Sequence, residues 1–218
     1  MRFKDKYYDD FNAVLLSKGE RQKPQKEYID YGKVPGSSVS LYEDTGTYFP
    51  YERTVEILSK DEAQLSEMYE WLDGAGRIWI DEGGYYNARV LSVESLTESY
   101  NLGWTRLTIT FEIQPFLFLD SPTIALTSGR TVWNPGLVSD PYFKITGTGS
   151  VTITINGESF TVNPVDQLIE IEWPKAYKGV LNKGGTLSAF PKIQPGSNTI
   201  TWTGTVTEVL FNGRWRTL

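Results

Sequence analysis

Apolar and polar side chains alternate along several short segments of this 218-residue chain, and this period of two constrains its fold most. The clearest segment carries Leu107, Ile109, Phe111 and Ile113 at every second position. Successive side chains of a strand point to opposite faces, so this alternation predicts a half-buried antiparallel strand. It recurs at 151–155, directly before Asn156-Gly157, a dipeptide typical of a two-residue hairpin turn. The sequence therefore predicts a mainly β protein.

One segment has the period of a helix instead. Leu65, Met68, Tyr69 and Leu72 recur at positions i, i+3, i+4 and i+7, which forms one apolar stripe. Ser59 and Glu62 have the spacing of a capping box, and Gly74 suits the left-handed residue that ends many helices. We therefore expect one helix over about residues 60–73, with its stripe packed on a sheet.

The charge and the residue composition of the chain both change near residues 120–122. Residues 1–118 contain 13 Lys and Arg against 20 Asp and Glu, whereas residues 119–218 contain 8 against 7. The first part is rich in Tyr and Glu, and the second is rich in Thr and Gly. We expect an α+β N-terminal domain over 1–118 and an all-β sandwich over 119–218.

The chain contains no Cys and no His. This excludes disulfides, thiolate and imidazole metal ligands, and Ser-His or Cys-His catalysis. The net charge of −6 argues against binding to a nucleic-acid backbone. No apolar run approaches the roughly 18 residues of a membrane span, and residues 1–10 lack the apolar core of an export signal. We expect no enzymatic activity, no cofactor, no metal and no membrane association, in a protein made in the cytoplasm.

Carboxylates are the commonest acid–base groups that remain. The adjacent pairs are Asp9-Asp10, Glu43-Asp44, Asp61-Glu62 and Asp81-Glu82. Neighbours on a strand point to opposite faces and cannot share one substrate, and acidic residues at 61–62 are explained by the start of a helix. We interpret these pairs as solvated surface, and a glycosidase that uses one of them is the weaker alternative.

Aromatic residues cluster near positions 7–11, 48–51 and 85–86, where they either close a core or anchor an interface. The candidate contact residues are Tyr48 and Tyr51, in an expected loop, and Tyr100 and Trp104, at an expected hairpin tip. Trp133 begins the phrase WNPG, which is either a turn entering the sandwich or a platform for stacking on a sugar.

The order of several short motifs resembles the distal tail proteins of long, non-contractile-tailed bacteriophages and their prophages. The first half carries EWLDG at 70–74, GRIWID at 76–81, YYNARV at 85–90 and FEIQPF at 111–116. The second half carries WNPG at 133–136, SDPYFKITGTG at 139–149 and FPKIQPGSNTI at 190–200. Each motif alone is weak evidence of a relationship, and the resemblance rests on the order and spacing of the motifs.

This resemblance implies a β-rich N-terminal domain with a helix and a long β-hairpin, followed by a galectin-like antiparallel β-sandwich. It implies a structural virion protein that forms a hexameric ring at the tail tip. Such a hub joins the tail tube protein to baseplate, tail-tip or tail-fibre proteins that contact the host, and a contact with the tape measure protein is also implied. The alternative is a carbohydrate-binding module that stacks sugars on Trp133 or Trp173, although without His the usual galectin site is not present.

Overall fold

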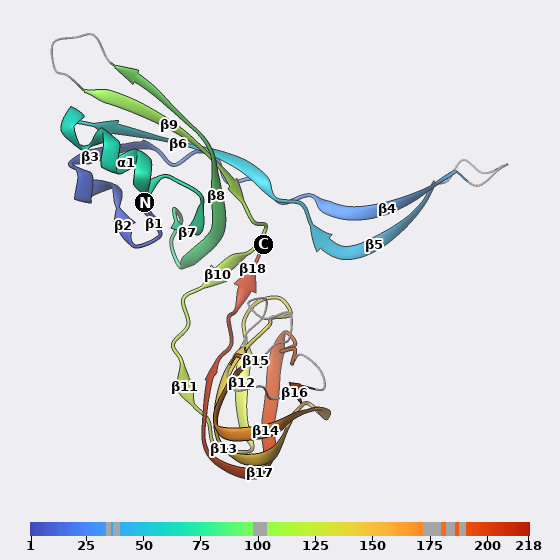
Figure 1. The fold of residues 1–218 in the computed structure, drawn as a ribbon. Coiled ribbons are helices and arrows are strands. Elements are labelled where there is room, and N and C mark those ends of the chain that lie inside the picture. Colours follow the sequence, from blue (N-terminus) through green and yellow to red (C-terminus); the bar gives the residue numbers. More distant parts are fainter. Residues whose placement is uncertain (34–35, 37–39, 98–103, 172–179, 182–185, 188–190) are drawn as a thin grey trace. The chain divides into compact units, whose positions relative to one another are not determined.

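The computed structural model describes residues 1–33, 36, 40–97, 104–171, 180–181, 186–187 and 191–218. It divides into two compact units, Met1–Leu117 with Leu218, and Phe118–Thr217. Antiparallel strands make up most of the described residues, together with one α-helix and two short 3-10 helices (Figure 1). The prediction of a mainly β protein with one helix is confirmed.

The first unit contains one curled sheet and a separate two-stranded ribbon. Its strands are β1 (Arg2–Phe3), β2 (Lys6–Tyr7), β3 (Ala13–Ser17), β4 (Lys26–Lys33), β5 (Ser40–Tyr48), β6 (Tyr51–Ser59), β7 (Ala75–Trp79), β8 (Gly84–Thr97) and β9 (Thr105–Ile113). The sheet runs in the order β2-β1-β7-β8-β9-β6-β3, and among the described strands β4 pairs with β5 alone. The 3-10 helix η1 (Tyr8–Phe11) and Asn12 link the two end strands β2 and β3, so the sheet curls until its edges come close.

The core of this unit lies inside the curl and follows the alternation seen in the sequence. All four apolar residues of β9 are buried, and the residues between them are only partly buried. The Phe3 ring lies edge-on to Phe111, with 5.4 Å between centroids, and Phe11 lies 4.9 Å from Trp71. The Trp71 indole N–H donates a 2.7 Å hydrogen bond to the Phe3 carbonyl, so this buried polar group is satisfied.

The helix begins later than the sequence predicts. Its first turn is the 3-10 helix η2 (Glu62–Gln64), followed by α1 (Leu65–Trp71), and the capping side chain belongs to Asp61, which accepts from the Ala63 N–H at 3.0 Å. The prediction that Ser59 caps the helix is wrong, because this residue ends β6, where it is buried and paired in the sheet.

The helical stripe is also only partly as predicted. Met68 and Leu72 are buried, but Tyr69 is 39% exposed and Trp71 is buried in its place. The short helix ends at Trp71, and Gly74 follows with φ +70°, the left-handed conformation that was predicted for it.

The second unit encloses a separate apolar core between long strands. The unit contains β11 (Ile124–Ala125), β12 (Arg130–Asn134), β13 (Tyr142–Ile155), β14 (Glu158–Ile171), β15 (Val180–Leu181), β16 (Thr186–Leu187), β17 (Gly196–Asn212) and β18 (Arg216–Thr217), and β10 (Leu117–Leu119) lies at the division between the units. The sheet order is β11-β17-β13-β14-β15, while β12 also pairs with β17 and β16 with β14. Asn156 and Gly157, both with positive φ, form the predicted turn between β13 and β14.

Glycines allow the long strands of this unit to bend around the core. β13 and β17 change register between Thr148 and Thr152, and Gly204 there has φ +108°. A Cβ at Gly204 would lie 2.4 Å from the Ser150 carbonyl oxygen, so no other residue fits without a shift of backbone. On either side of this bend, β17 pairs with β12 at one end and with β11 at the other.

Candidate functional site

The described residues offer two surfaces that are suited to binding. No group of three or more His, Cys, Asp or Glu among them is placed to hold a metal ion. None of the helices in the described part of the chain is long and apolar enough to cross a membrane. The features that stand out are a two-sided apolar ribbon in the first unit and a pocket at the edge of the second.

The ribbon consists of β4 and β5 and exposes large apolar side chains on both faces. Its exposed residues, each between 46% and 63% exposed, are Tyr28, Ile29, Tyr31, Leu41 and Tyr42. A two-stranded ribbon with no sheet behind it is only marginally stable in water, and two long unpaired edges favour association. The ribbon is therefore suited to being covered by another protein surface.

Cross-strand contacts organise each face of the ribbon. On one face, the rings of Tyr28 and Tyr42 meet edge to face with 6.4 Å between centroids. On the other face, the Tyr31 hydroxyl donates a 2.5 Å hydrogen bond to the Glu43 carboxylate, which raises the pKa of Tyr31. Pairs of this kind stabilise a sheet locally, so the aromatic side chains are held in place before any partner arrives.

Two glycine bulges give the ribbon its local twist. The register shifts between Asp30 and Lys33 and again opposite Lys26–Tyr28. At each shift an aspartate accepts from a glycine N–H two residues later, Gly32 to Asp30 at 2.7 Å and Gly46 to Asp44 at 2.9 Å. Both glycines have positive φ, so these turns depend on glycine.

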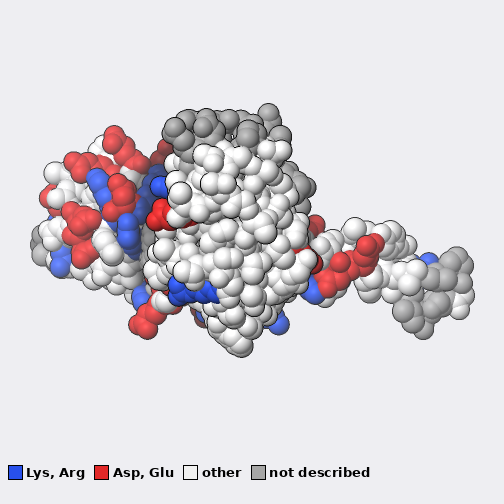
Figure 2. All heavy atoms as spheres, turned by 90° about the horizontal axis from the view of Figure 1, so that it is seen from below, with Lys and Arg blue, Asp and Glu red and all other residues white. Residues whose placement is uncertain are grey.

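The ribbon is acidic as well as aromatic. Four carboxylates and two lysines lie on β4 and β5, and Figure 2 shows acidic atoms along the ribbon. Lys26 pairs with Asp44, which lowers the pKa of Asp44 and raises that of Lys26 through their hydrogen bond. The carboxylates that remain favour a partner surface with positive charge.

An ion pair between a buried arginine and a partly exposed aspartate lies near the segment that leads into the ribbon. Arg53 of β6, 4% exposed, donates to both carboxylate oxygens of Asp81 at 2.9 and 3.0 Å. The same guanidinium donates to the carbonyls of Lys18 (2.8 Å) and Gly19 (3.3 Å), in the chain between β3 and β4. The Tyr86 hydroxyl donates to Asp81 at 3.1 Å. Asp81, one of the carboxylates considered for catalysis, is therefore engaged in holding the sheet and this segment together.

This ion pair predicts a dependence of stability on pH. The hydrogen bonds from Arg53 hold the pKa of Asp81 below its ordinary value of 3.8, although burial opposes them. A lowered pKa in the folded state means that the stabilisation is complete above the unfolded pKa and is lost as pH falls through the folded pKa. Urea unfolding at about pH 7 and about pH 3 should show Asp81→Asn less stable than wild type at the higher pH, with a smaller difference at the lower. An equal difference at both pH values would contradict this role for the carboxylate.

Two predicted contact residues, Tyr48 and Tyr51, lie close together in the chain but in strands and not in a loop. Tyr48 ends β5 and Tyr51 begins β6, so only Phe49 and Pro50 separate the strands. Both tyrosines are half-buried, and the Tyr48 ring lies edge-on to Phe116 at 5.8 Å. Burial raises the pKa of Tyr51. The expectation of an aromatic loop is corrected, because strand pairing continues almost to both residues.

Of the other two predicted contact residues, the structure describes only Trp104. Tyr100 lies outside the described residues. Trp104 precedes β9, half-buried, with the Lys60 ammonium 5.5 Å from its ring centroid. Tyr51 pairs with Ile113 at the opposite end of β9, nine residues from Trp104, which places it roughly 31 Å away along the strand at about 3.4 Å per residue.

Sequence reasoning missed the ribbon, although one signal was present. Segments 26–33 and 40–48 are rich in Tyr, Ile and Thr, which favour strands. Apolar residues occur there at both odd and even positions, so the sequence shows no alternation that would indicate a buried face. Two neighbouring segments of strand-forming residues, each with apolar and acidic residues on both faces, would have indicated the ribbon.

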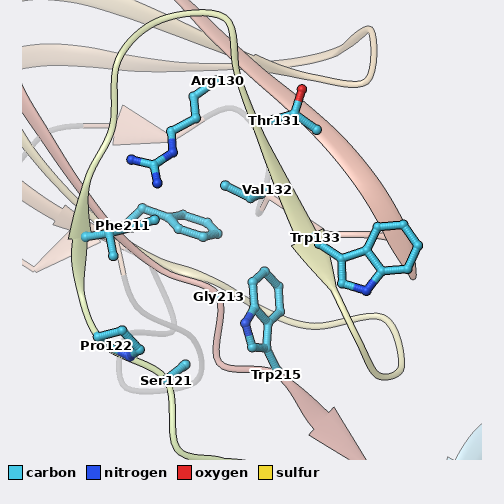
Figure 3. A pocket seen from close by; sticks show the side chains of 10 residues that line it. Ser121, Pro122, Arg130, Thr131, Val132, Trp133, Phe211, Gly213 and Trp215 are labelled. Carbon is cyan, nitrogen blue, oxygen red and sulfur yellow. The ribbon is translucent and has the colours of Figure 1, made fainter.

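The pocket of the second unit lies between the segment around β11, the strand β12 and the end of β17 (Figure 3). Its volume is about 250 Å³, and its walls include Ile124, Phe211 and Trp215. Trp133 lines its margin and is 68% exposed. The turn predicted after Trp133 is present, because Asn134 accepts from the Gly136 N–H at 2.9 Å, while Trp133 itself lies in β12. Trp173 lies outside the described residues.

Comparisons with known proteins relate the chain to phage tail structures. No protein-family model and no curated protein sequence matches it. The Dit protein of phage SPP1, described as a paradigm of the hub adsorption apparatus in phages that infect Gram-positive bacteria, matches 99% of this chain and 98% of its own, with 14% identity and a TM-score of 0.63. A chain of the phage p2 baseplate, in its activated conformation with Sr, matches 96% of this chain and 88% of its own, with 9% identity and a TM-score of 0.51. The resemblance to distal tail proteins is thus confirmed as a likeness of fold, and the chain has the fold of SPP1 Dit over nearly its whole length.

Proposed function

We propose that this chain is a structural component of a phage tail, which assembles as a hexameric ring at the distal end. In this role it joins the tail tube protein to baseplate, tail-tip or tail-fibre proteins that contact the host, and it acts through shape and contacts without catalysis. It would be made in the host cytoplasm and incorporated into the virion. A contact with the tape measure protein belongs to the same proposal.

The observation that carries this proposal is the match to SPP1 Dit across both compact units at once. A match limited to one β-sandwich would say little, because such folds serve many functions. A match that retains both units, in the same order, over 99% of one chain and 98% of the other is more specific.

The ribbon supports assembly of the first unit into a ring. A head-to-tail contact generates a closed ring when its rotation closes, and it requires two different surfaces on each copy. The exposed, acidic and aromatic ribbon is one such surface. Tyr48 and Tyr51, near its base, are included in the proposed contact, whereas Tyr100 and Trp104 remain candidates from the sequence.

Light scattering on the purified full-length chain tests the proposal. At micromolar and higher concentrations, the expected mass is about six times the 24.7 kDa of one chain, and negative-stain images should show a ring with a central hole. A mass of one chain at every concentration would contradict the ring.

The alternative function, carbohydrate binding, is favoured by one observation, the exposed indole of Trp133 beside a pocket. Binding of glycans to the full-length chain that is lost in Trp133→Ala would support it. The pocket is poor in the oxygen acceptors that sugar hydroxyls require, since no Asp, Glu, Asn or Gln is among the described residues that line it. We therefore place this function second.

A further inference from the structure

The edge pocket of the second unit combines an opening with rigid aromatic walls. Trp215 packs directly on Gly213, where an added Cβ would lie 2.1 Å from the indole, and its ring lies 5.9 Å from Phe211. Figure 3 shows the guanidinium of Arg130 on one side of the opening and Trp215 on the other. Walls that are fixed by packing accept an apolar side chain without first having to become ordered.

Beside the pocket runs an open strand edge. Among the described residues, β12 pairs with β17 alone. In an antiparallel pair the N–H and C=O groups point alternately toward the partner and away from it. The Ile200 carbonyl faces β12 and lies opposite Arg130, whereas Thr199, opposite Thr131, bonds Asn156 on the other side of β17 through both its N–H and its C=O. The N–H and C=O of Thr131, and by the same alternation those of Trp133, therefore point away from β17. An extended chain lying along this side of β12 can therefore form main-chain hydrogen bonds.

The pocket also carries the positive charge of Arg130, which forms no ion pair with a carboxylate among the described residues. Arg130 donates one hydrogen bond to the Ala125 carbonyl at 3.1 Å, which holds the guanidinium across the opening. A guanidinium has five N–H donors, so most of them remain for a ligand. Within the described ranges, no acidic side chain lines the pocket and no ion pair includes Arg130.

We propose that β12 and the edge pocket bind an extended acidic peptide segment of a partner protein. The segment adds a strand along β12, inserts one apolar side chain into the pocket against Ile124 and Trp215, and places an Asp or Glu carboxylate on Arg130. Strand addition provides affinity through the backbone, and the pocket and the charge provide sequence preference. This site belongs to the second unit and does not depend on formation of the ring.

The same features favour a peptide over a sugar. The side-chain oxygens in the lining belong to Ser121 and Thr131, and each already has a hydrogen-bond partner, Asn212 for Ser121 and Thr199 for Thr131. A sugar would lose hydrogen bonds to water that this lining does not replace, whereas a peptide backbone finds its partners on β12.

Selection of displayed random seven-residue peptides on the immobilised full-length chain tests the proposal. Enriched peptides are expected to alternate apolar residues with others and to contain Asp or Glu. The best peptide is then synthesised, and its affinity is measured by fluorescence anisotropy. Arg130→Gln should weaken binding by about tenfold or more, as expected for loss of a charge-assisted hydrogen bond. Arg77→Gln, the same change at an exposed arginine of the first unit, should leave the affinity unchanged.

N-methylation of the peptide separates strand addition from simple charge attraction. Methyl groups at alternate amides should abolish binding in one register and leave it intact in the other, because only alternate N–H groups face β12. Equal affinity of Arg130→Gln and wild type, enrichment of peptides without acidic residues, or indifference to N-methylation would each overturn the proposal. Displacement of the peptide by tetragalacturonate at lower concentration than by unlabelled peptide would instead assign the pocket to an acidic glycan. The light-scattering mass reports on the ring separately.

Discussion

Replacing Arg53 by methionine is expected to lower the free energy of unfolding of the first unit by about 2–3 kcal/mol, the range for losing hydrogen bonds to a charged group. The Asp81 side chain is 22% exposed, so water solvates part of the carboxylate once Arg53 is lost. The substitution removes both hydrogen bonds to Asp81 and leaves that carboxylate with Tyr86 as its remaining side-chain donor in the described structure. It also leaves the carbonyls of Lys18 and Gly19 without their donor. Urea unfolding, followed by tryptophan fluorescence and compared with wild type, measures the loss.

A matched control is available in the same sheet. Arg89 pairs with Glu112 at 3.0 Å, but the Arg89 side chain is 59% exposed. Arg89→Met should therefore change the free energy of unfolding by less than about 1 kcal/mol. If Arg53→Met were no more destabilising than Arg89→Met, the pair of Arg53 with Asp81 would not be what holds this part of the sheet.

Replacing both Tyr28 and Tyr42 by serine should convert the proposed ring into single chains at micromolar concentration. The two rings meet across one face of the ribbon, and each is more than half exposed in a single chain. Aromatic anchors at an interface contribute about 2 kcal/mol or more each, so the pair should weaken each contact by roughly a thousandfold. Light scattering over a range of concentrations measures the shift in mass.

The control for this variant must change a tyrosine without changing the ribbon. Tyr69 lies on α1 and is 39% exposed, so Tyr69→Ser should leave the mass as in wild type. Urea unfolding should show that the double variant keeps the stability of the sheet, because neither tyrosine belongs to its core. A double variant with the mass of wild type would remove the ribbon from the proposed contact.

Local patterns predicted much of the fold. The alternation along 105–113 identified β9 and its buried residues, and Asn156-Gly157 identified the turn between β13 and β14. Gly74 was correctly expected in a left-handed conformation. Each of these features depends on neighbours within a few residues, either through side-chain period or through the φ that a glycine permits.

Other features could not be predicted in this way, because their partners are distant in the chain. The expected cap at Ser59 failed because β6 extends to that residue and pairs it with Thr105 in β9. The pairing of Arg53 with Asp81 joins two elements 28 residues apart, and only the curl of the sheet brings them together. The edge pocket likewise unites residues near 122, 131 and 213.

The sequence by itself determined that this chain is mainly β with one helix, and its motif order indicated the fold of a distal tail protein. These conclusions follow from periodicity and turn chemistry, which act over a few residues. Only the tertiary structure decided which side chains are exposed on the ribbon, which carboxylate holds the sheet, and where an open strand edge meets a charged pocket. Exposure and pairing depend on contacts between distant segments, and period-two alternation does not specify which strand lies beside which.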